Sequence, residues 1–222
     1  MKKNRIVAGV LAVGLALGLA GCASQSSLPK ASGFLPDYSL LKPVPSPAGI
    51  QVYTYQNPAA KRSDYNAVFI APVVLYQTAT TNGVTQPQID AARDNIQNGL
   101  RKIVGQSITV ANNRGPGVAQ LNVAITGAAL EGDGLHARNL IPISAAIKLA
   151  STATDLNEKT PVLVVELKFV DSMTGQLLRE TVTTIHGEQF RNRVNTADEF
   201  ALLAQQWVQQ ALQYSSAHNS LQ

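Results

Sequence analysis

Residues 161–186, PVLVVELKFVDSMTGQLLRETVTTIH, contain the pattern that decides the fold. Pro161 to Asp171 is rich in Val and Leu, a composition typical of a β-strand. Ser172-Met173-Thr174-Gly175 follows as a turn, because glycine can adopt a positive φ. Gln176 to His186 then returns as the partner strand. We therefore predict a β-hairpin over these residues.

The region after the hairpin has the strongest helical periodicity in the chain. Thr196 with Glu199 fits a capping box that opens a helix. Apolar residues then recur at helical spacing: Phe200, Leu203, Ala204, Trp207, Val208, Ala211 and Leu212. Burial of this face requires the helix to pack on the sheet, which places Trp207 in the core rather than in a ligand site. We expect residues 215–222 to form a flexible polar tail.

Before the hairpin, two strands are predicted, then a helix. Ile50 to Tyr55 alternates as a short strand, and Tyr65 to Tyr76 is typical of a strand buried on both faces. Within it, Pro72 lacks a ladder donor and indicates a bulge or a change of pairing. Residues 85–88 have the capping-box spacing of a helix start. The apolar face of this helix consists of Ile89, Ala92, Ile96, Leu100 and Ile103. Gly105 is expected to cap its C-terminus.

The middle of the chain completes the predicted fold. Ser107 to Ala111 is a short strand candidate, and Leu121 to Thr126 alternates as a half-buried strand. Glu131 to Asn139 is predicted to be a loop, and Ile141 to Ala153 a short helix or a strand, of which we favour the helix. The order β, β, α, β, β, (α), β, β, α predicts an α/β (α+β) two-layer sandwich, with a mixed sheet and amphipathic helices packed on it. Residues 50–214 would form this single domain.

The N-terminus has the features of a secretory signal. Lys2, Lys3 and Arg5 precede an uncharged run, Ile6 to Ala20, that is shorter than a membrane-spanning helix needs. Leu19-Ala20-Gly21-Cys22 closely resembles the lipobox of bacterial lipoproteins. This resemblance implies cleavage between Gly21 and Cys22, and a Cys22 that carries S-diacylglycerol and an N-acyl chain such as palmitate. An uncleaved signal anchor with an incidental Cys22 is the disfavoured alternative.

The residues after Cys22 predict where the chain is held. In lipoproteins, Asp directly after the cysteine retains the protein in the inner membrane. Ala23 and Ser24 stand here, so we expect a lipid anchor in the outer membrane, facing the periplasm. Residues 22–49 are rich in Ser and Pro and are expected to form a tether. Because exposed aromatic residues gain nothing on a free leash, we expect the stretch containing Phe34 and Tyr38 to dock on the domain; both are also candidates for an interaction surface.

Composition excludes several classes of function. The net charge of +4 falls when residues 1–21 are removed, because Lys2, Lys3 and Arg5 leave with them. The mature chain therefore gives no charge argument for nucleic acid. Cys22 is the sole cysteine, and its acylation would leave no thiol for a disulfide, for catalysis or for a Cys-based metal site.

Candidate catalytic and metal-binding residues are few. Asp133 with His136 falls short of a metal site, His186 ends a strand, and His218 lies in the tail. We find no nucleophile elbow, P-loop, dinucleotide fingerprint or zinc-protease motif, and we predict no enzyme, no metal and no cofactor. A basic rim is possible from Arg191, Arg193, Lys61 and Arg62, although such small clusters are usually solvated surface.

Several segments together resemble one family. They are Ser32-Gly33-Phe34-Leu35-Pro36-Asp37-Tyr38 with Leu41-Lys42-Pro43, Tyr65 with Ala71-Pro72-Val73, Gly115-Pro116-Gly117, Asp171 to Gly175, and Trp207. The pattern resembles the bacterial lipoprotein family called domain of unknown function 3313, although Ala71 replaces an expected acidic residue. The resemblance implies a lipoprotein without established activity and supplies no catalytic residues.

The function predicted from these observations is that of a non-catalytic envelope lipoprotein. It would act as a structural or interaction module, attached to the membrane through its lipid, with an envelope protein or glycan as partner. A periplasmic hydrolase with a non-motif site, or a carrier of a small molecule or lipid, are the alternatives. The hydrolase would need His136 or His186 near a serine and a carboxylate in a cleft, and the carrier would need a sizeable apolar pocket.

Overall fold

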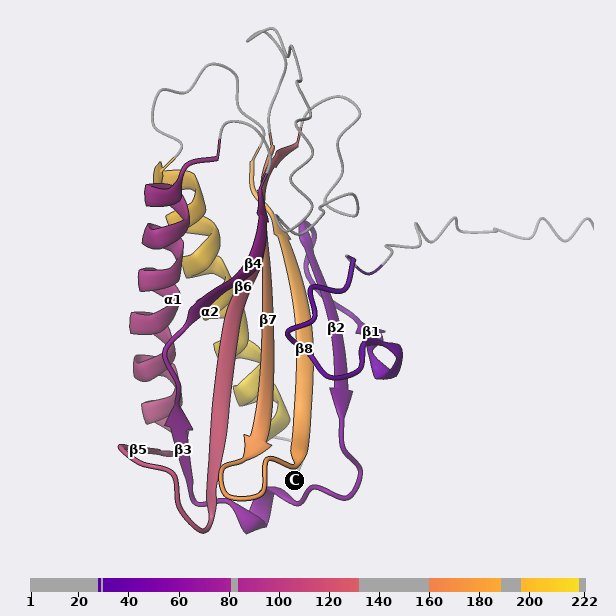
Figure 1. Cartoon of the computed structure of the whole chain (residues 1–222), viewed down its shortest axis with the longest axis vertical. Coiled ribbons are helices and arrows are strands. Elements are labelled where there is room, and N and C mark those ends of the chain that lie inside the picture. Colours follow the sequence, from indigo (N-terminus) through magenta and orange to yellow (C-terminus); the bar gives the residue numbers. More distant parts are fainter. Residues whose placement is uncertain (1–27, 29, 81–83, 132–159, 189–196, 220–222) are drawn as a thin grey trace, which may run out of the picture.

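A computed structural model describes residues 28, 30–80, 84–131, 160–188 and 197–219. Its regular elements are β1 (Lys42–Val44), β2 (Ile50–Gln56), β3 (Ala67–Ile70), β4 (Val74–Thr80), α1 (Gln86–Ser107), β5 (Thr109–Ala111), β6 (Val118–Glu131), β7 (Thr160–Asp171), β8 (Leu177–His186) and α2 (Ala197–Asn219). Two 3-10 turns, Tyr38–Leu40 and Arg62–Asp64, flank β1 and β3. Eight strands form one sheet in the order β1-β2-β8-β7-β6-β3-β5, with β4 also paired to β6 (Figure 1). The predicted α+β fold with a mixed sheet and packed helices is confirmed.

The β7–β8 hairpin is the long antiparallel centre of the sheet. Its turn has Gly175 at φ 74°, and the Asp171 carboxylate accepts hydrogen bonds from the backbone N–H groups of Met173 (2.9 Å) and Thr174 (2.7 Å). These bonds fix the turn locally, because an Asp side chain can replace a backbone acceptor there. The hairpin predicted from residues 161–186 is therefore confirmed.

The stretch that we predicted as one strand, residues 65–76, is two. β3 ends at Ile70 and β4 begins at Val74, with Pro72 in the gap, and both strands pair with β6 in parallel. The pairing offset to β6 changes by one residue across the gap. In the gap, the Val73 N–H donates to Oε1 of Gln97 on α1 (2.7 Å), so a helix side chain satisfies a donor that the sheet does not pair. The change of strand pairing predicted at Pro72 is observed.

Helix α1 begins as predicted, but its end differs. The Thr85 N–H donates to Gln88 Oε1 (2.5 Å), the reciprocal half of a capping box. The helix runs through Gly105 to Ser107 and ends at Ile108, which is extended. The prediction that Gly105 caps the helix was wrong, because Gly105 keeps helical geometry and sits over Val110. The apolar face of α1 is buried as predicted, from Ile89 to Ile103.

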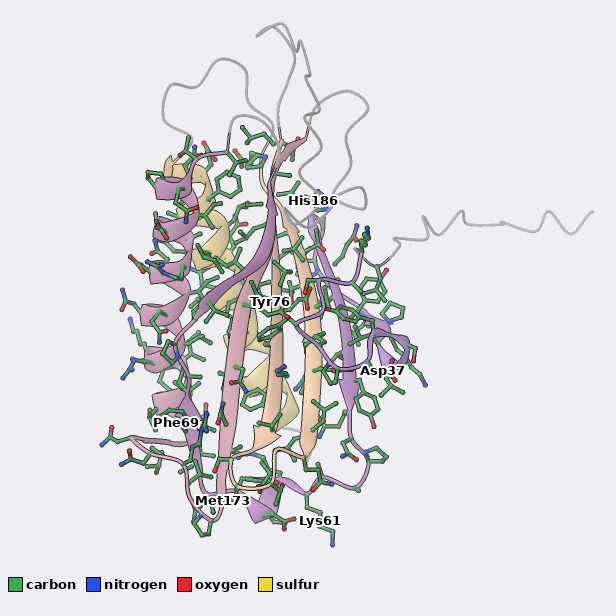
Figure 2. All side chains as sticks on the ribbon, viewed as in Figure 1. Asp37, Lys61, Phe69, Tyr76, Met173 and His186 are labelled. Atoms are coloured by element: carbon green, nitrogen blue, oxygen red, sulfur yellow. The ribbon has the colours of Figure 1, made fainter. Side chains whose placement is uncertain are left out.

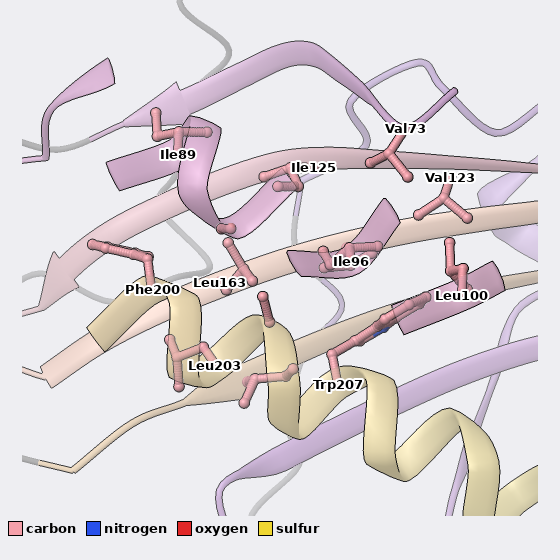
Figure 3. Close-up of a cluster of buried hydrophobic side chains, with 14 of the residues drawn as sticks. Val73, Ile89, Ile96, Leu100, Val123, Ile125, Leu163, Phe200, Leu203 and Trp207 are labelled. Atoms are coloured by element: carbon pink, nitrogen blue, oxygen red, sulfur yellow. The ribbon is translucent and has the colours of Figure 1, made fainter. Parts of the chain in front are cut away.

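The main core lies between the two helices and one face of the sheet. Phe200, Leu203 and Trp207 of α2 are buried against α1 and the central strands (Figure 3). The helix axes approach closely at Gly99, where a Cβ atom would lie 2.6 Å from Val208 Cγ atoms. Helix α2 continues through residues 215–219, beyond the point where we placed the start of the tail.

Strand β6 is more buried than its alternation predicts. Ala124 and Thr126 were expected to face solvent, but their exposed fractions are 0% and 6%. The strand has both faces covered, by the helices on one side and by the N-terminal segment on the other. The half-buried prediction for residues 121–126 was therefore wrong.

The Pro-rich segment is also more ordered than predicted. We expected residues 22–49 to form a tether, yet Pro43 lies in β1, which forms the edge of the sheet and pairs with β2. An edge strand tolerates proline because one side of its ladder needs no donor. Upstream of β1, the chain crosses the sheet face opposite the helices (Figure 1).

Part of the chain lies outside the described residues. This part includes Leu19-Ala20-Gly21-Cys22, the helix favoured at residues 141–153, and Thr196 of the second capping box. It also includes all of the loop predicted at Glu131 to Asn139 except Glu131, which is the last residue of β6 and not part of a loop. In the part that is described, neither helix is long and apolar enough to cross a membrane.

Candidate functional site

The segment that covers the second face of the sheet is residues 32–41, which we call the clasp. It buries Phe34, Leu35 and Leu41, whose exposed fractions are 9%, 4% and 7%. These side chains pack on Tyr53 and on the Val and Ala side chains of the central strands. Each large apolar side chain buried in this way contributes roughly 1.5–3 kcal/mol before the cost of ordering the chain. The clasp is therefore a layer of the domain.

The clasp is closed on itself by the hydroxyl of Tyr38. The backbone N–H groups of Ser32, Gly33 and Leu35 point to this oxygen at 3.2, 3.2 and 3.3 Å, and Ser32 Oγ lies 2.9 Å from it. Gly33 adopts φ 90°, a conformation that favours glycine and turns the chain around the ring. The motif Ser-Gly-Phe-Leu-Pro-Asp-Tyr thus folds into a compact loop around one phenol oxygen.

The same hydroxyl fastens the clasp to β7. Tyr38 donates to Glu166 Oε2 (2.5 Å), and Thr126 of β6 donates to Glu166 Oε1 (2.9 Å). Glu166 is 2% exposed, and its burial raises the pKa of the carboxyl, although both hydrogen bonds oppose that rise. Burial, and then the bond to Glu166, also raises the pKa of the Tyr38 phenol. This phenol therefore stays protonated and serves as a donor.

A lysine makes the second attachment. Lys168 Nζ donates to the Phe34 carbonyl oxygen (2.6 Å) and lies 4.5 Å from the centre of the Phe34 ring. Tyr76 of β4 packs against the Phe34 ring in an edge-to-face arrangement, with the two ring centroids 5.4 Å apart. A cation over an aromatic face is favourable and is stronger where water is excluded. Burial lowers the pKa of Lys168, and the nearby Glu180 and Glu166 oppose that change.

The third charged residue beneath the clasp has no hydrogen bond. Glu180 of β8 stands opposite Lys168 in the β7–β8 register and is 0% exposed. Neither of its carboxylate oxygens has a hydrogen-bond partner in the described part of the chain. Burial raises the pKa of Glu180 to about 7, with a further contribution from Asp37. Strand β8 thus carries a buried carboxyl whose surroundings favour the protonated form.

The arrangement is suited to holding the clasp on the sheet. Tyr38, Glu166 and Lys168 each make a hydrogen bond between the two. Ser32 contacts Tyr38, but a phenol with a raised pKa is a poor general base. No group of three or more His, Asp or Glu side chains in the described residues is placed to hold a metal ion.

Some of the predicted site residues are among those that the structure describes, and others are not. Phe34 and Tyr38 contact this chain's own sheet. His186 ends β8, where its N–H donates to the Gly49 carbonyl (2.7 Å). His218 lies within the last turns of α2. The remaining candidates lie outside the described residues: Cys22, Asp133, His136, Arg191 and Arg193.

Sequence reasoning missed Glu166, Lys168 and Glu180. Their signal was present, because these three charged residues lie within two strands that are otherwise rich in Val, Leu and Thr. Charged residues at every second position of a strand share one face, so Glu166 and Lys168 were placed together by the period alone. The strand periodicity could not predict that the clasp would cover these charged side chains.

The fold and the clasp together define the class of protein. It is an α+β domain whose mixed sheet carries two helices on one face and its own N-terminal segment on the other. The family described as "Protein of unknown function (DUF3313)" matches residues 30–211, a range that includes the whole clasp. The chain belongs to this family, and the resemblance predicted from its motifs is confirmed.

Named relatives of the chain include a lipoprotein. The chain is 26% identical over 178 residues to the uncharacterized lipoprotein YdcL of Escherichia coli (strain K12), covering 79% of this chain and 80% of that protein. Among solved structures, the PelC dodecamer from Paraburkholderia phytofirmans has a TM-score of 0.35 at 16% identity, over 70% of this chain and 91% of that one. A minor lipoprotein from Acinetobacter baumannii has a TM-score of 0.33 at 10% identity, over 68% and 95%. At these TM-scores the two structures carry no argument about function.

Proposed function

We propose that this chain is a non-catalytic lipoprotein of the bacterial outer membrane, anchored through acylated Cys22 and facing the periplasm. Its domain would act as a structural or interaction module of the envelope, with an envelope protein or glycan as partner. The lipobox pattern at residues 19–22 and the lipoprotein among the relatives support the anchor. The absence of an enzymatic name in that relative and the structural use of Tyr38 and Glu166 support a role without catalysis.

The observation that carries the proposal is the docked clasp, because it shortens the leash. Ser32, the first clasp residue, follows Cys22 after only ten residue steps. A flexible chain of that length spans roughly 16–19 Å on average, against roughly 26–32 Å if residues 22–49 were all free. The domain would therefore stay close to the membrane, where it can contact only partners at or near the surface. Two or more acyl chains give a stable anchor, whereas one chain gives marginal binding.

Membrane fractionation of matched variants tests the anchor and its location. The full chain should sediment with outer membranes. Cys22→Ala should leave that fraction, because the acylated side chain is removed. Ala23→Asp keeps Cys22 and should move the protein to the inner membrane. Recovery of Cys22→Ala in the outer-membrane fraction would contradict the proposed anchor.

Site-specific crosslinking tests the interaction role. Met173, in the β7–β8 turn, is 65% exposed and lies at the opposite end of the long axis from His186 (Figure 2). Leu202 on α2 is 50% exposed and serves as a comparison on a different surface. A photo-crosslinker at each site, in living cells, should give a discrete adduct at one surface and not the other. Absence of adducts at both, and at further exposed sites, would count against an interaction module.

A further inference from the structure

The buried carboxyl of Glu180 lies under the clasp in a surrounding that does not suit a charge. Its exposed fraction is 0%, and within the described residues no donor reaches its oxygens. An ionised carboxylate without a hydrogen bond is costly in such a place, and the group then takes up a proton instead. Movement of the clasp would give Glu180 access to water and remove that cost.

The charged and titratable groups around Glu180 come from three directions. Lys168 faces it from β7 and, within the described ranges, is the one cation that acts on it, while Glu166 is the next residue on that face of β7. Asp37 of the clasp adds negative potential. Tyr55 stands opposite Glu180 in the β2–β8 register. With both glutamates ionised, a single lysine would face two buried carboxylates and an acidic neighbour, so the closed clasp favours one bound proton.

We propose that the clasp is a proton-coupled latch: residues 32–41 close over protonated Glu180, and loss of that proton shifts the clasp towards the open state. Closing takes up one proton from solvent and opening returns it. Tyr38, bonded to Glu166, and Lys168, bonded to the Phe34 carbonyl, hold the closed state. The apolar contacts of Phe34, Leu35 and Leu41 set how far it opens at any pH.

The latch would control the length of the leash. With the clasp closed, at most nine residues separate Cys22 from the clasp, and Leu28 among them packs on the same cluster. With the clasp open, the free segment extends towards β1 and Ile50. The consequence for distance from the membrane rests on the proposed anchor at Cys22. The coupling itself does not, because it involves only the clasp and the sheet beneath it.

Hydrogen–deuterium exchange of the full-length protein in detergent tests the coupling. Exchange of peptides covering residues 32–41 is compared at pH 5.5 and pH 8.5, after correction for the intrinsic rate. Because the pKa of Glu180 is about 7 when buried and 4.5 in an ordinary setting, protection of these peptides should fall at the higher pH. If Glu180 regains its ordinary pKa in the open state, the fall in protection between pH 5.5 and pH 8.5 is at most about 30-fold. Peptides from Phe200 to Ala211 should show no such change.

Glu180→Gln and Glu188→Gln form the matched pair. The first substitution mimics the protonated side chain and should keep the clasp protected at both pH values. The second makes the same chemical change at an exposed residue just after β8 and should leave the fall intact. A fall that persists in Glu180→Gln would overturn the proposal. Equal protection of the wild-type clasp at both pH values would also overturn the proposal, and this measurement uses the wild-type protein alone. Neither outcome bears on the anchor, which is tested by fractionation.

Discussion

Tyr38 concentrates more interactions than any other described residue of the clasp. Its hydroxyl closes the loop from Ser32 to Leu35 and reaches Glu166 on β7. The sequence predicted that this aromatic residue docks on the domain, because an exposed aromatic side chain on a free tether contributes no stability. The partner could not be predicted, since Glu166 is 128 positions away and nothing local distinguishes its carboxyl from a solvated one. Long-range pairing of this kind depends on the complete fold.

Removal of that hydroxyl should weaken the closed clasp. Tyr38→Phe keeps the ring but deprives Glu166 of a donor and leaves three backbone N–H groups without their acceptor. Unpaired buried polar groups cost about 1–3 kcal/mol, so the free energy of unfolding should fall by roughly that amount. Denaturant titration measures it.

Tyr76→Phe is the control for Tyr38→Phe. The Tyr76 hydroxyl donates to Gly33 at 3.3 Å in an exposed setting, and its ring contact with Phe34 would be kept. A loss below about 0.5 kcal/mol is expected, as for most exposed substitutions. Equal losses in the two variants would show that the Tyr38 hydroxyl has no special role.

At the scale of elements, helix periodicity was the most informative signal. It identified the buried faces of α1 and α2, because a helix that packs on a sheet must repeat its apolar residues at helical spacing. It did not locate the end of α1, which lies beyond Gly105 at Ser107, because glycine is common both at helix caps and within helices. The split of β3 from β4 was indicated by Pro72, but the acceptor for Val73, Gln97 of α1, depends on how the helix crosses the sheet.

Two glycines of α1 should respond in opposite ways to alanine. Gly99→Ala would put a Cβ atom 2.6 Å from Val208 of α2, so the helices must separate. Overpacking of this kind costs typically 1–3 kcal/mol and exceeds the gain in helix propensity. At Gly105 the nearest atom, in Val110, would lie 3.8 Å away, so Gly105→Ala should stabilise by up to about 1 kcal/mol.

Thermal unfolding of the two alanine variants measures this difference. The expected order of melting temperature is Gly105→Ala highest, wild type next, and Gly99→Ala lowest. If Gly99→Ala melts at or above the wild-type temperature, the close approach of α1 and α2 is wrong.

At the scale of the molecule, buried acids should make stability depend on pH. Glu166 and Glu180 have raised pKa values in the folded chain, so the folded state binds more protons than the unfolded state. Their contribution is fully present below their ordinary pKa of 4.5 and is lost as the pH rises through the folded values, which for Glu180 is about 7. Asp171 has a lowered pKa and acts in the opposite sense, but only below pH 4.

The denaturation midpoint should therefore fall between pH 5 and pH 8. Glu180→Gln should be more stable than wild type at pH 8, by at most about 3 kcal/mol and by less where water screens the charge. At pH 4, below the ordinary pKa of 4.5, the carboxyl is mostly protonated in both the folded and the unfolded state, so the two proteins should unfold at nearly the same denaturant concentration. A Glu180→Gln variant that is less stable than wild type at pH 8 would show that the ionised carboxylate is favourable where it lies.

The sequence and the structure agree on the architecture and differ on its second face. Amphipathic periods predicted a sheet with helices on one side. The other side was predicted to be half exposed at β6, because alanine and threonine at positions 124 and 126 are compatible with either solvent or a thin covering layer. The docked N-terminal segment is what buries these two positions. Its prolines had predicted an extended tether, so the sequence did not indicate this covering layer.

Replacement of the clasp tests the account most directly. Residues 32–41 are exchanged for a Gly-Ser segment of equal length, so that the leash keeps its length while Phe34, Leu35, Tyr38 and Leu41 are lost. Because the clasp is a layer of the domain, the melting temperature should fall by at least about 5 °C, at roughly 2–4 °C per kcal/mol for a domain of this size. An unchanged melting temperature would mean that residues 32–41 are a free leash, and the account of the clasp would be wrong.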